Sequence, residues 1–401
     1  MMNDKEKSII ESIKKLQQIG YLDENIIKEF EPKILEVKSL LLSFFFASEV
    51  KGADVRAHGQ VILDSRDLDF NYQFAEYIEG ADVRAHGKVI LDSLDLNYNY
   101  LFAREIKGAD VRAHGKVIIA SQDLGYNYLF AKDVKGADAK THGKVILDSK
   151  NLEYNYKFAK DVEGADVRAH GKVIIDSKKL GYNYEFASEV KGADVRAHGQ
   201  AIIDSGDLKY NYEFAKDVEG ADVRAHGKVI IASQDLIYNY RFAFRDGADV
   251  GAHGKVIIAS KDLYYNYRFA KDIRKADIKA HEKIILDSKN LMYNYMFARD
   301  IEGADVKAHG QVIIDNQDLD YNYLFARDVK GADVRAHGQV ILDSKDILHN
   351  KRFMCLDVVD TSYRTTVVDN LCRDEISQYK EDLNRSLDSI LEQKKKIRVK
   401  K

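Results

Sequence analysis

Histidine recurs along this chain at a fixed interval, and histidine is the side chain most often used to bind a metal ion or move a proton near neutral pH. Eleven copies lie 28 residues apart, with one interval of 27: His58, His86, His114, His142, His170, His198, His226, His253, His281, His309 and His337. A zinc site needs three or four ligands at about 2 Å, but equivalent residues of stacked helices lie roughly 10 Å apart. No second ligand type recurs beside each histidine. We therefore expect no metal, no cofactor and no catalytic residue.

Asparagine recurs with the histidines, mostly at the centre of a Tyr-Asn-Tyr motif. Both residue types fall among apolar positions, and a buried polar group is costly unless it is hydrogen-bonded. We hypothesise that each asparagine pairs with a histidine or a backbone group of its own or the adjacent repeat, and that this polar ladder fixes the stacking register. Representative members are His86, Asn99, His114, Asn127, His170 and Asn183. A buried neutral histidine has a pKa below about 6.5, so stability should fall as the pH drops.

The first helix of each repeat, which we call helix A, is illustrated by residues 67–80. At about 100° per residue its apolar side chains fall on one arc, and Asp67 stands where helices take an N-cap. Equivalent positions carry Asp or Asn in every copy except Lys179. Gly80 follows the last apolar position, where a left-handed residue commonly ends a helix.

A second amphipathic helix, helix B, follows after a two-residue turn and begins with Asp82 as its N-cap. His86 lies on its apolar side, and Gly87 follows directly. A glycine inside a helix costs about 1 kcal/mol relative to alanine. We interpret it as room for the close approach of a neighbouring helix.

Two short helices per 28 residues cannot bury their apolar sides alone, whereas stacked neighbours can. The sequence therefore predicts an all-α fold, a right-handed α-solenoid of about 11 two-helix repeats with helical caps at both ends. We expect an N-terminal helical cap with a degenerate repeat at residues 1–50 and the array at residues 51–346. A C-terminal helical cap with a basic tail should occupy residues 347–401.

The repeat resembles the short HEAT-like helical-hairpin repeats over roughly residues 25–355. It is also similar to arrays in some bacterial and large-virus proteins whose unit reads Asp-Pro-x-Tyr-x-Tyr-x-Phe-Ala and then Val-x-Gly-Ala-Asp-Ile. Residues 123–131 here read Asp-Leu-Gly-Tyr-Asn-Tyr-Leu-Phe-Ala, and residues 134–139 read Val-Lys-Gly-Ala-Asp-Ala. This chain departs from that unit in the Leu at the Pro position, the Asn between the tyrosines and the His-Gly inside helix B. The resemblance implies a solenoid whose second helices line the concave face, and it implies no particular activity.

Composition narrows the setting in which the chain works. A net charge of −3 indicates neither a general polyanion binder nor an acidic mimic. The first residues lack the apolar core of a signal peptide, and no run of about 18 apolar residues suggests a membrane span. Cys355 and Cys372 stand outside the array without metal-like spacing. We expect a reduced, cytoplasmic setting and no membrane contact.

The polar side of helix B carries the first candidate binding surface. Its arginine row comprises Arg56, Arg84, Arg112, Arg168, Arg196, Arg224 and Arg335. Such a row could follow nucleic-acid phosphates. Aspartates such as Asp92 lie further along each helix and could neutralise it, and the tyrosines suited to base stacking belong largely to helix A. A self-paired solvated stripe, a polyanion contact and a protein contact are the three interpretations.

Two exposed positions of helix A form a second candidate surface, because they vary between repeats while the frame stays constant. Residues i and i+4 share a helix face, so the variable residues form one strip. Its late part is apolar: Ile237, Tyr264, Met292 and Met296. Selection for binding and drift at unconstrained positions both produce this pattern. The shortened junction at residues 242–247 should bend or loosen the stack.

No paired carboxylates, nucleophile set or phosphate loop stands outside the repeated frame, so the sequence predicts that the protein is not an enzyme. Our first hypothesis is a scaffold that binds a protein partner through an extended solenoid surface. The alternatives are a nucleic-acid or polyanion binder that uses the arginine row, and a passive structural spacer.

Overall fold

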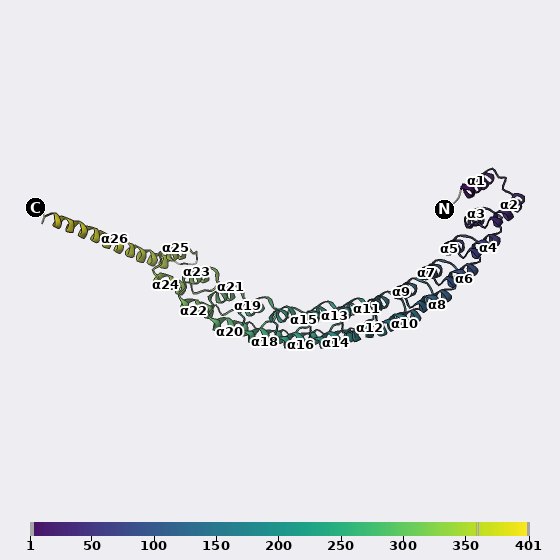
Figure 1. Ribbon diagram of the computed structural model, residues 1–401. Helices are drawn as coiled ribbons and strands as arrows, with labels where there is room; N and C mark the ends of the chain where they lie inside the picture. The colour runs from purple at the N-terminus through teal and green to yellow at the C-terminus, as the bar shows by residue number, and fades with distance from the viewer. Residues whose placement is uncertain (1–3, 358, 360, 399–401) are drawn as a thin grey trace. The chain divides into compact units, whose positions relative to one another are not determined.

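The computed structural model describes residues 4–357, 359 and 361–398, and this part of the chain contains 26 α-helices and no strand (Figure 1). Successive short helices pair as hairpins, and each hairpin packs against the next. The fold is therefore an all-α solenoid of stacked helical hairpins, as the 28-residue period predicted. Its handedness stays a prediction.

Each repeat contains helix A and then helix B. The A helices are α5 (Leu68–Tyr77), α7 (Leu96–Glu105), α9 (Leu124–Asp133), α11 (Leu152–Asp161), α13 (Leu180–Glu189), α15 (Leu208–Asp217), α17 (Leu236–Phe242), α19 (Leu263–Asp272), α21 (Leu291–Asp300), α23 (Leu319–Asp328) and α25 (Ile347–Met354). The B helices are α4 (Val55–Ser65), α6 (Val83–Ser93), α8 (Val111–Ser121), α10 (Ala139–Ser149), α12 (Val167–Asp176), α14 (Val195–Ser205), α16 (Val223–Ser233), α18 (Val250–Ser260), α20 (Ile278–Ser288), α22 (Val306–Asn316) and α24 (Val334–Asp343).

The helices form two compact units, which do not coincide with the three segments expected from the sequence. The first unit contains residues 1–205 and 217–221, and the second contains residues 206–216 and 222–401. Both units contain the same kind of hairpin.

The core of each hairpin is completed by its neighbour. In the first unit Ala75 and Ile90 of one repeat form a buried cluster with Phe102 and Ile106 of the next. Phe102 and Ile90 are fully buried. Burying such a side chain stabilises the fold by about 1.5–3 kcal/mol, so the apolar faces contribute only when the repeats are stacked.

Side-chain caps begin the helices at the predicted residues. Asp67 accepts the backbone N–H of Phe70 at 3.0 Å at the start of α5, and Asp82 accepts that of Ala85 at 3.0 Å at the start of α6. Gly80 has a φ of 85°, in the left-handed region expected for it. The ends of the B helices were not foreseen, because residues such as Arg66 also take a left-handed φ, of 55°.

The departure at Lys179 gives a testable prediction. Lys179 occupies the N-cap of α13 and makes no side-chain cap hydrogen bond. Lys179→Asp should raise the free energy of unfolding by about 1 kcal/mol, because an aspartate there can accept a backbone N–H of the first turn. Urea denaturation measures the change. Lys179→Ala removes the same charge without adding a cap, so an equal gain in both variants would contradict the capping explanation.

The expectation that helix B lines the concave face is wrong for the first unit. There the A helices α5, α7, α9 and α11 follow the inner side of the curve, and the B helices α6, α8, α10 and α12 follow the outer side (Figure 1). Neighbouring A helices also contact each other more closely than neighbouring B helices do. Rings such as Tyr100 and Tyr126, with centroids 6.3 Å apart, pack edge to face between the A helices.

The chain before the array forms α1 (Asp4–Gln18), α2 (Glu24–Val37) and α3 (Leu40–Glu49). Their buried cluster includes Ile13, Ile34 and Phe46. After the array, α25 begins like an A helix and α26 (Thr361–Arg398) follows it. Residues 399–401 of the predicted basic tail, and the side chains of residues 390–398, lie outside the described part of the chain.

Candidate binding surfaces

The asparagine–histidine ladder is built from one side chain of each helix in a hairpin. In the hairpin of α11 and α12, Asn155 Oδ1 lies 2.8 Å from His170 Nδ1. The amide nitrogen of Asn155 donates to the carbonyl of Ile146 in the preceding B helix at 3.0 Å, and to the carbonyl of Asn151 at 2.7 Å. Both side chains are buried. Asn155 thereby ties its own hairpin to the one before it.

The same contact recurs along the array. An asparagine Oδ1 lies 2.7–2.9 Å from a histidine Nδ1 in ten pairs: Asn71 with His86, Asn99 with His114, Asn127 with His142, Asn155 with His170, Asn183 with His198, Asn211 with His226, Asn239 with His253, Asn266 with His281, Asn294 with His309 and Asn322 with His337. The six ladder residues named from the sequence are all members. His86 pairs with the asparagine of its own hairpin, as do the others.

The hydrogen bonds define which ring nitrogen carries the proton. Asn155 uses both amide protons on carbonyls, so its Oδ1 must accept and His170 must donate from Nδ1. His170 Nε2 is then a lone-pair acceptor. A Cβ built on Gly143 would lie 3.5 Å from this atom and 3.0 Å from the ring of Phe158. The glycine of helix B therefore makes room for the phenylalanine and histidine of the next hairpin.

Burial keeps the ladder histidines uncharged at neutral pH. The pKa of His142 and of His170 falls to about 4 because burial disfavours the charged ring, and the N-cap aspartate of the same helix opposes this only in part. The same value of about 4 holds for the pKa of His86, His114, His198, His226, His253, His281 and His337. These side chains serve the stacking of repeats.

Two repeats carry a glutamate where the others have glycine, and each glutamate reaches the next histidine. Glu31 Oε1 lies 3.2 Å from His58 Nε2, and Glu282 Oε1 lies 3.4 Å from His309 Nε2. Burial still lowers the pKa of both histidines. His58 has no asparagine partner, because Ser43 stands at that position. Its proton therefore belongs on Nε2, facing Glu31.

A second polar column, which sequence reasoning missed, joins successive A helices. The hydroxyl of Tyr156 donates to Glu189 Oε2 of the next A helix at 2.5 Å, and Lys160 lies 2.5 Å from the same oxygen. Tyr100 reaches Asp133 in the same way, at 2.8 Å. The signal was available, because an acidic residue recurs 33 residues after the second tyrosine of most motifs.

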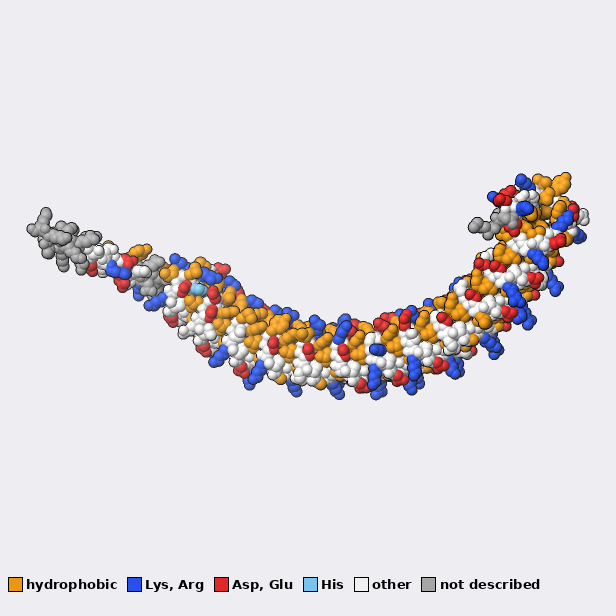
Figure 2. Space-filling view, viewed as in Figure 1, with side chains coloured by type: hydrophobic (Ala, Val, Ile, Leu, Met, Phe, Trp, Pro, Cys, Tyr) orange, Lys and Arg blue, Asp and Glu red, His pale blue; other side chains and the backbone are white. Residues whose placement is uncertain are grey.

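The arginine row is exposed on helix B, as expected. Figure 2 shows Lys and Arg side chains projecting along the side of the chain formed by the B helices. Six of its members make no ion pair within the described residues: Arg56, Arg84, Arg112, Arg168, Arg196 and Arg224. The aspartates are taken by nearer partners, since Lys88 lies 3.0 Å from Asp92 and Gln60 lies 2.7 Å from Asp64. Arg335 is exposed as well.

The apolar strip lies within the second unit. Ile237, Tyr264 and Met292 occupy the second position of α17, α19 and α21 and remain 47%, 50% and 43% exposed. Equivalent positions of the first unit carry Asp69, Asn97, Gly125, Glu153 and Gly181. Met296 differs from the expectation because it is half-buried, packed between the cores of two adjacent hairpins. The apolar strip is therefore Ile237, Tyr264 and Met292.

Comparisons with known proteins add no relative. A scan against protein-family models and searches of curated proteins and of solved structures found no significant match. No helix among the described residues combines the length and apolar character needed to cross a membrane. Within the same residues, no group of three or more His, Cys, Asp and Glu side chains could hold a metal ion.

Proposed function

We propose that the protein is a non-enzymatic repeat scaffold that binds a protein partner through the apolar strip, Ile237, Tyr264 and Met292. The observation that supports this is the recurrence of a half-exposed apolar side chain at one position of three consecutive A helices. Neighbouring helices place such side chains roughly 10 Å apart, which gives a continuous patch. Exposed apolar patches mark contact sites, and aromatic residues and methionine are enriched in interface cores.

The first unit provides a built-in comparison for this proposal. The same frame carries polar residues or glycine at the equivalent positions there, so the frame does not require apolar side chains. We expect the partner to be a cytoplasmic protein, in keeping with the free thiol of Cys355.

A triple variant tests the proposal. Ile237→Asn, Tyr264→Glu and Met292→Asp install residues that other repeats carry, so the free energy of unfolding should change little. Affinity for a captured protein partner, measured by titration with purified protein, should fall by at least about 10-fold, because buried apolar anchors dominate interface energies. Tyr77→Ser removes an exposed tyrosine outside the strip and serves as the control. Equal affinity of the triple variant and the wild type would rule out the strip as the contact.

A second candidate function is polyanion binding by the arginine row. Six exposed arginines without an ion pair in the described residues favour it. Affinity for a generic RNA or DNA duplex would then fall steeply with salt, because bound cations release counterions from the phosphates. Replacing Arg84, Arg112 and Arg168 with glutamine should reduce that salt dependence. Duplex binding that ignores salt, or is absent, would count against this function.

A further inference from the structure

Three departures from the repeat frame meet at the junction between α17 and α18. The step between repeats is one residue short there, and α17 has 7 residues where α15 and α19 have 10. Gly251 stands where the arginine row has Arg224 in the preceding repeat. Lys275 replaces the glycine of the next loop and keeps the left-handed φ of that glycine, at 70°. A non-glycine residue held at such a φ stores strain, which clusters at functional sites.

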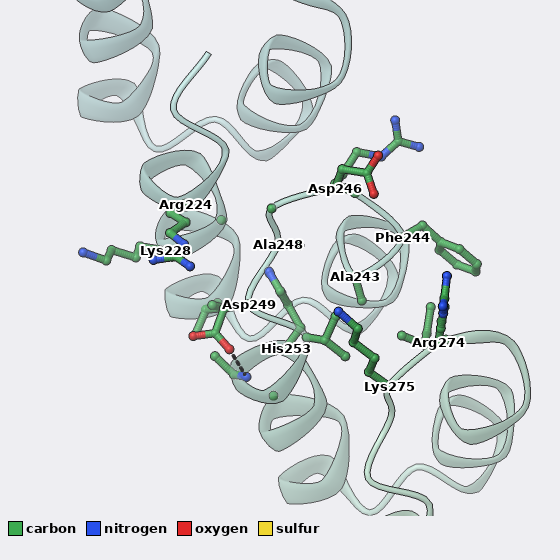
Figure 3. A pocket seen from close by; sticks show the side chains of 18 of the residues that line it. Arg224, Lys228, Ala243, Phe244, Asp246, Ala248, Asp249, His253, Arg274 and Lys275 are labelled. Carbon is green, nitrogen blue, oxygen red and sulfur yellow. Dashed lines mark hydrogen bonds between the residues drawn. The ribbon is translucent and has the colours of Figure 1, made fainter. Parts of the chain in front are cut away.

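The three departures surround a cavity of about 1160 Å³ (Figure 3). Gly251 contributes no side chain to it, and a Cβ built there would meet only Asp249 Oδ1, at 3.6 Å. The position therefore has room for the arginine of other repeats, and its absence helps to keep the cavity open. Gly227 of α16 also lines the wall.

The cavity is lined by more cations than carboxylates. Its cationic residues are Arg224, Lys228, Arg245, Arg274 and Lys275, and its acidic residues are Asp246, Asp249 and Asp272. Figure 3 shows Arg224 and Lys228 on one side and Arg274 and Lys275 on the other, with His253 between them. Asp249 already accepts the backbone N–H of Ala252 at 3.0 Å, and Asp272 accepts the hydroxyl of Tyr240 at 2.7 Å. Two of the three carboxylates are therefore engaged elsewhere.

One buried acceptor in the wall has no partner. His253 is fully buried, and its Nδ1 lies 2.8 Å from Asn239 Oδ1. Asn239 donates its amide protons to the carbonyls of Ile230 and Asp235, so His253 carries its proton on Nδ1. His253 Nε2 is then an acceptor, and it makes no hydrogen bond with any described residue. A buried polar atom of this kind calls for a donor.

We propose that this cavity is a binding site for a phosphate group that retains one proton. Arginine and lysine donors on both sides bind the phosphate oxygens, and the remaining P–O–H donates to His253 Nε2. Sulfate and carboxylate carry no such proton near neutral pH and lack this donor. The phosphate comes from a free phosphate ester or from a phosphorylated side chain of a protein. The site does not depend on the apolar strip.

Calorimetric titration of the full chain with inorganic phosphate tests the site, at pH 6.5 and constant ionic strength, with sulfate as the comparison ion. Lys275→Gly restores the glycine of the frame and removes the strained φ, so it should fold at least as well while losing about 10-fold in phosphate affinity. Gly251→Gln fills the cavity with a neutral side chain and should lower the affinity similarly. Lys172→Gln, at the position equivalent to Lys228 in another repeat, should leave it unchanged.

A phosphoserine peptide distinguishes the two sources of the phosphate. Tighter binding of this peptide than of inorganic phosphate identifies a phosphorylated protein, and equal or weaker binding identifies a free phosphate ester. The proposal is overturned by the absence of phosphate binding, by equal affinity for sulfate, or by unchanged affinity in both Lys275→Gly and Gly251→Gln.

Discussion

At pH 5 the helical array is expected to be unfolded, and at pH 7.5 it is expected to be fully folded. Nine ladder histidines have a pKa of about 4 in the folded state because they are buried. In the unfolded chain their pKa is about 6.5. The unfolded state therefore binds more protons below pH 6.5. The stability that is complete above that pH is lost as the pH falls toward 4.

The size of this effect decides the outcome. Between pH 7 and pH 5 each such histidine lowers the free energy of unfolding by about 2 kcal/mol. Nine of them together exceed the roughly 5–15 kcal/mol by which folded domains are stable. Carboxylates with lowered pKa values, such as Asp328 and Glu189, respond at still lower pH. Hydrogen bonding to Asp346 raises the pKa of His349, which acts in the opposite direction but is a single group.

Urea denaturation followed by circular dichroism at several pH values between 7.5 and 5 measures this loss. His142→Gln provides a non-titrating control and should reduce the dependence of the free energy of unfolding on pH by up to about 1.4 kcal/mol per pH unit. A free energy of unfolding that stays constant from pH 7.5 to pH 5 would show that the histidines are not buried as the structure describes.

Loss of a single ladder asparagine should be the most damaging conservative change in the array. Asn155→Ala removes the partner of three buried groups, namely Ile146 O, Asn151 O and His170 Nδ1. Each unsatisfied buried group costs about 1–3 kcal/mol, so we expect a loss of about 3–5 kcal/mol in the free energy of unfolding. Thermal and urea denaturation give the value.

Asn151→Asp is the matched control for this variant. Asn151 is an exposed N-cap four residues earlier, and most other repeats carry aspartate at this position. The control should therefore change the free energy of unfolding by less than about 0.5 kcal/mol. If Asn155→Ala were equally mild, the asparagine would not tie the hairpins together.

Much of the fold could be predicted because the repeat shows its own rules eleven times over. The apolar period placed helix A within residues 67–80, and α5 is Leu68–Tyr77. The caps Asp67 and Asp82 marked the helix starts, because a side-chain acceptor is needed where backbone N–H groups lack partners. Burial of the histidines and asparagines followed from their place among apolar positions.

Features that depend on the spacing between neighbouring helices could not be predicted in this way. Met296 shares a helix face with Met292, yet it is half-buried because the next A helix covers it. The concave side depends on how closely A helices approach each other, which no single repeat reveals. The cavity beside Gly251 arises only when a shortened loop and a missing arginine meet in space.

The most direct test of the asparagine–histidine ladder is the tautomeric state of its rings, measured by long-range ¹H–¹⁵N NMR at pH 7.5. The hydrogen bonds require a neutral ring with the proton on Nδ1 in histidines such as His86 and His170, and on Nε2 in His58, which faces Glu31. Observation of that contrast would support the ladder. Protons on Nε2 throughout, or rings that titrate near the pKa of free histidine, would contradict it.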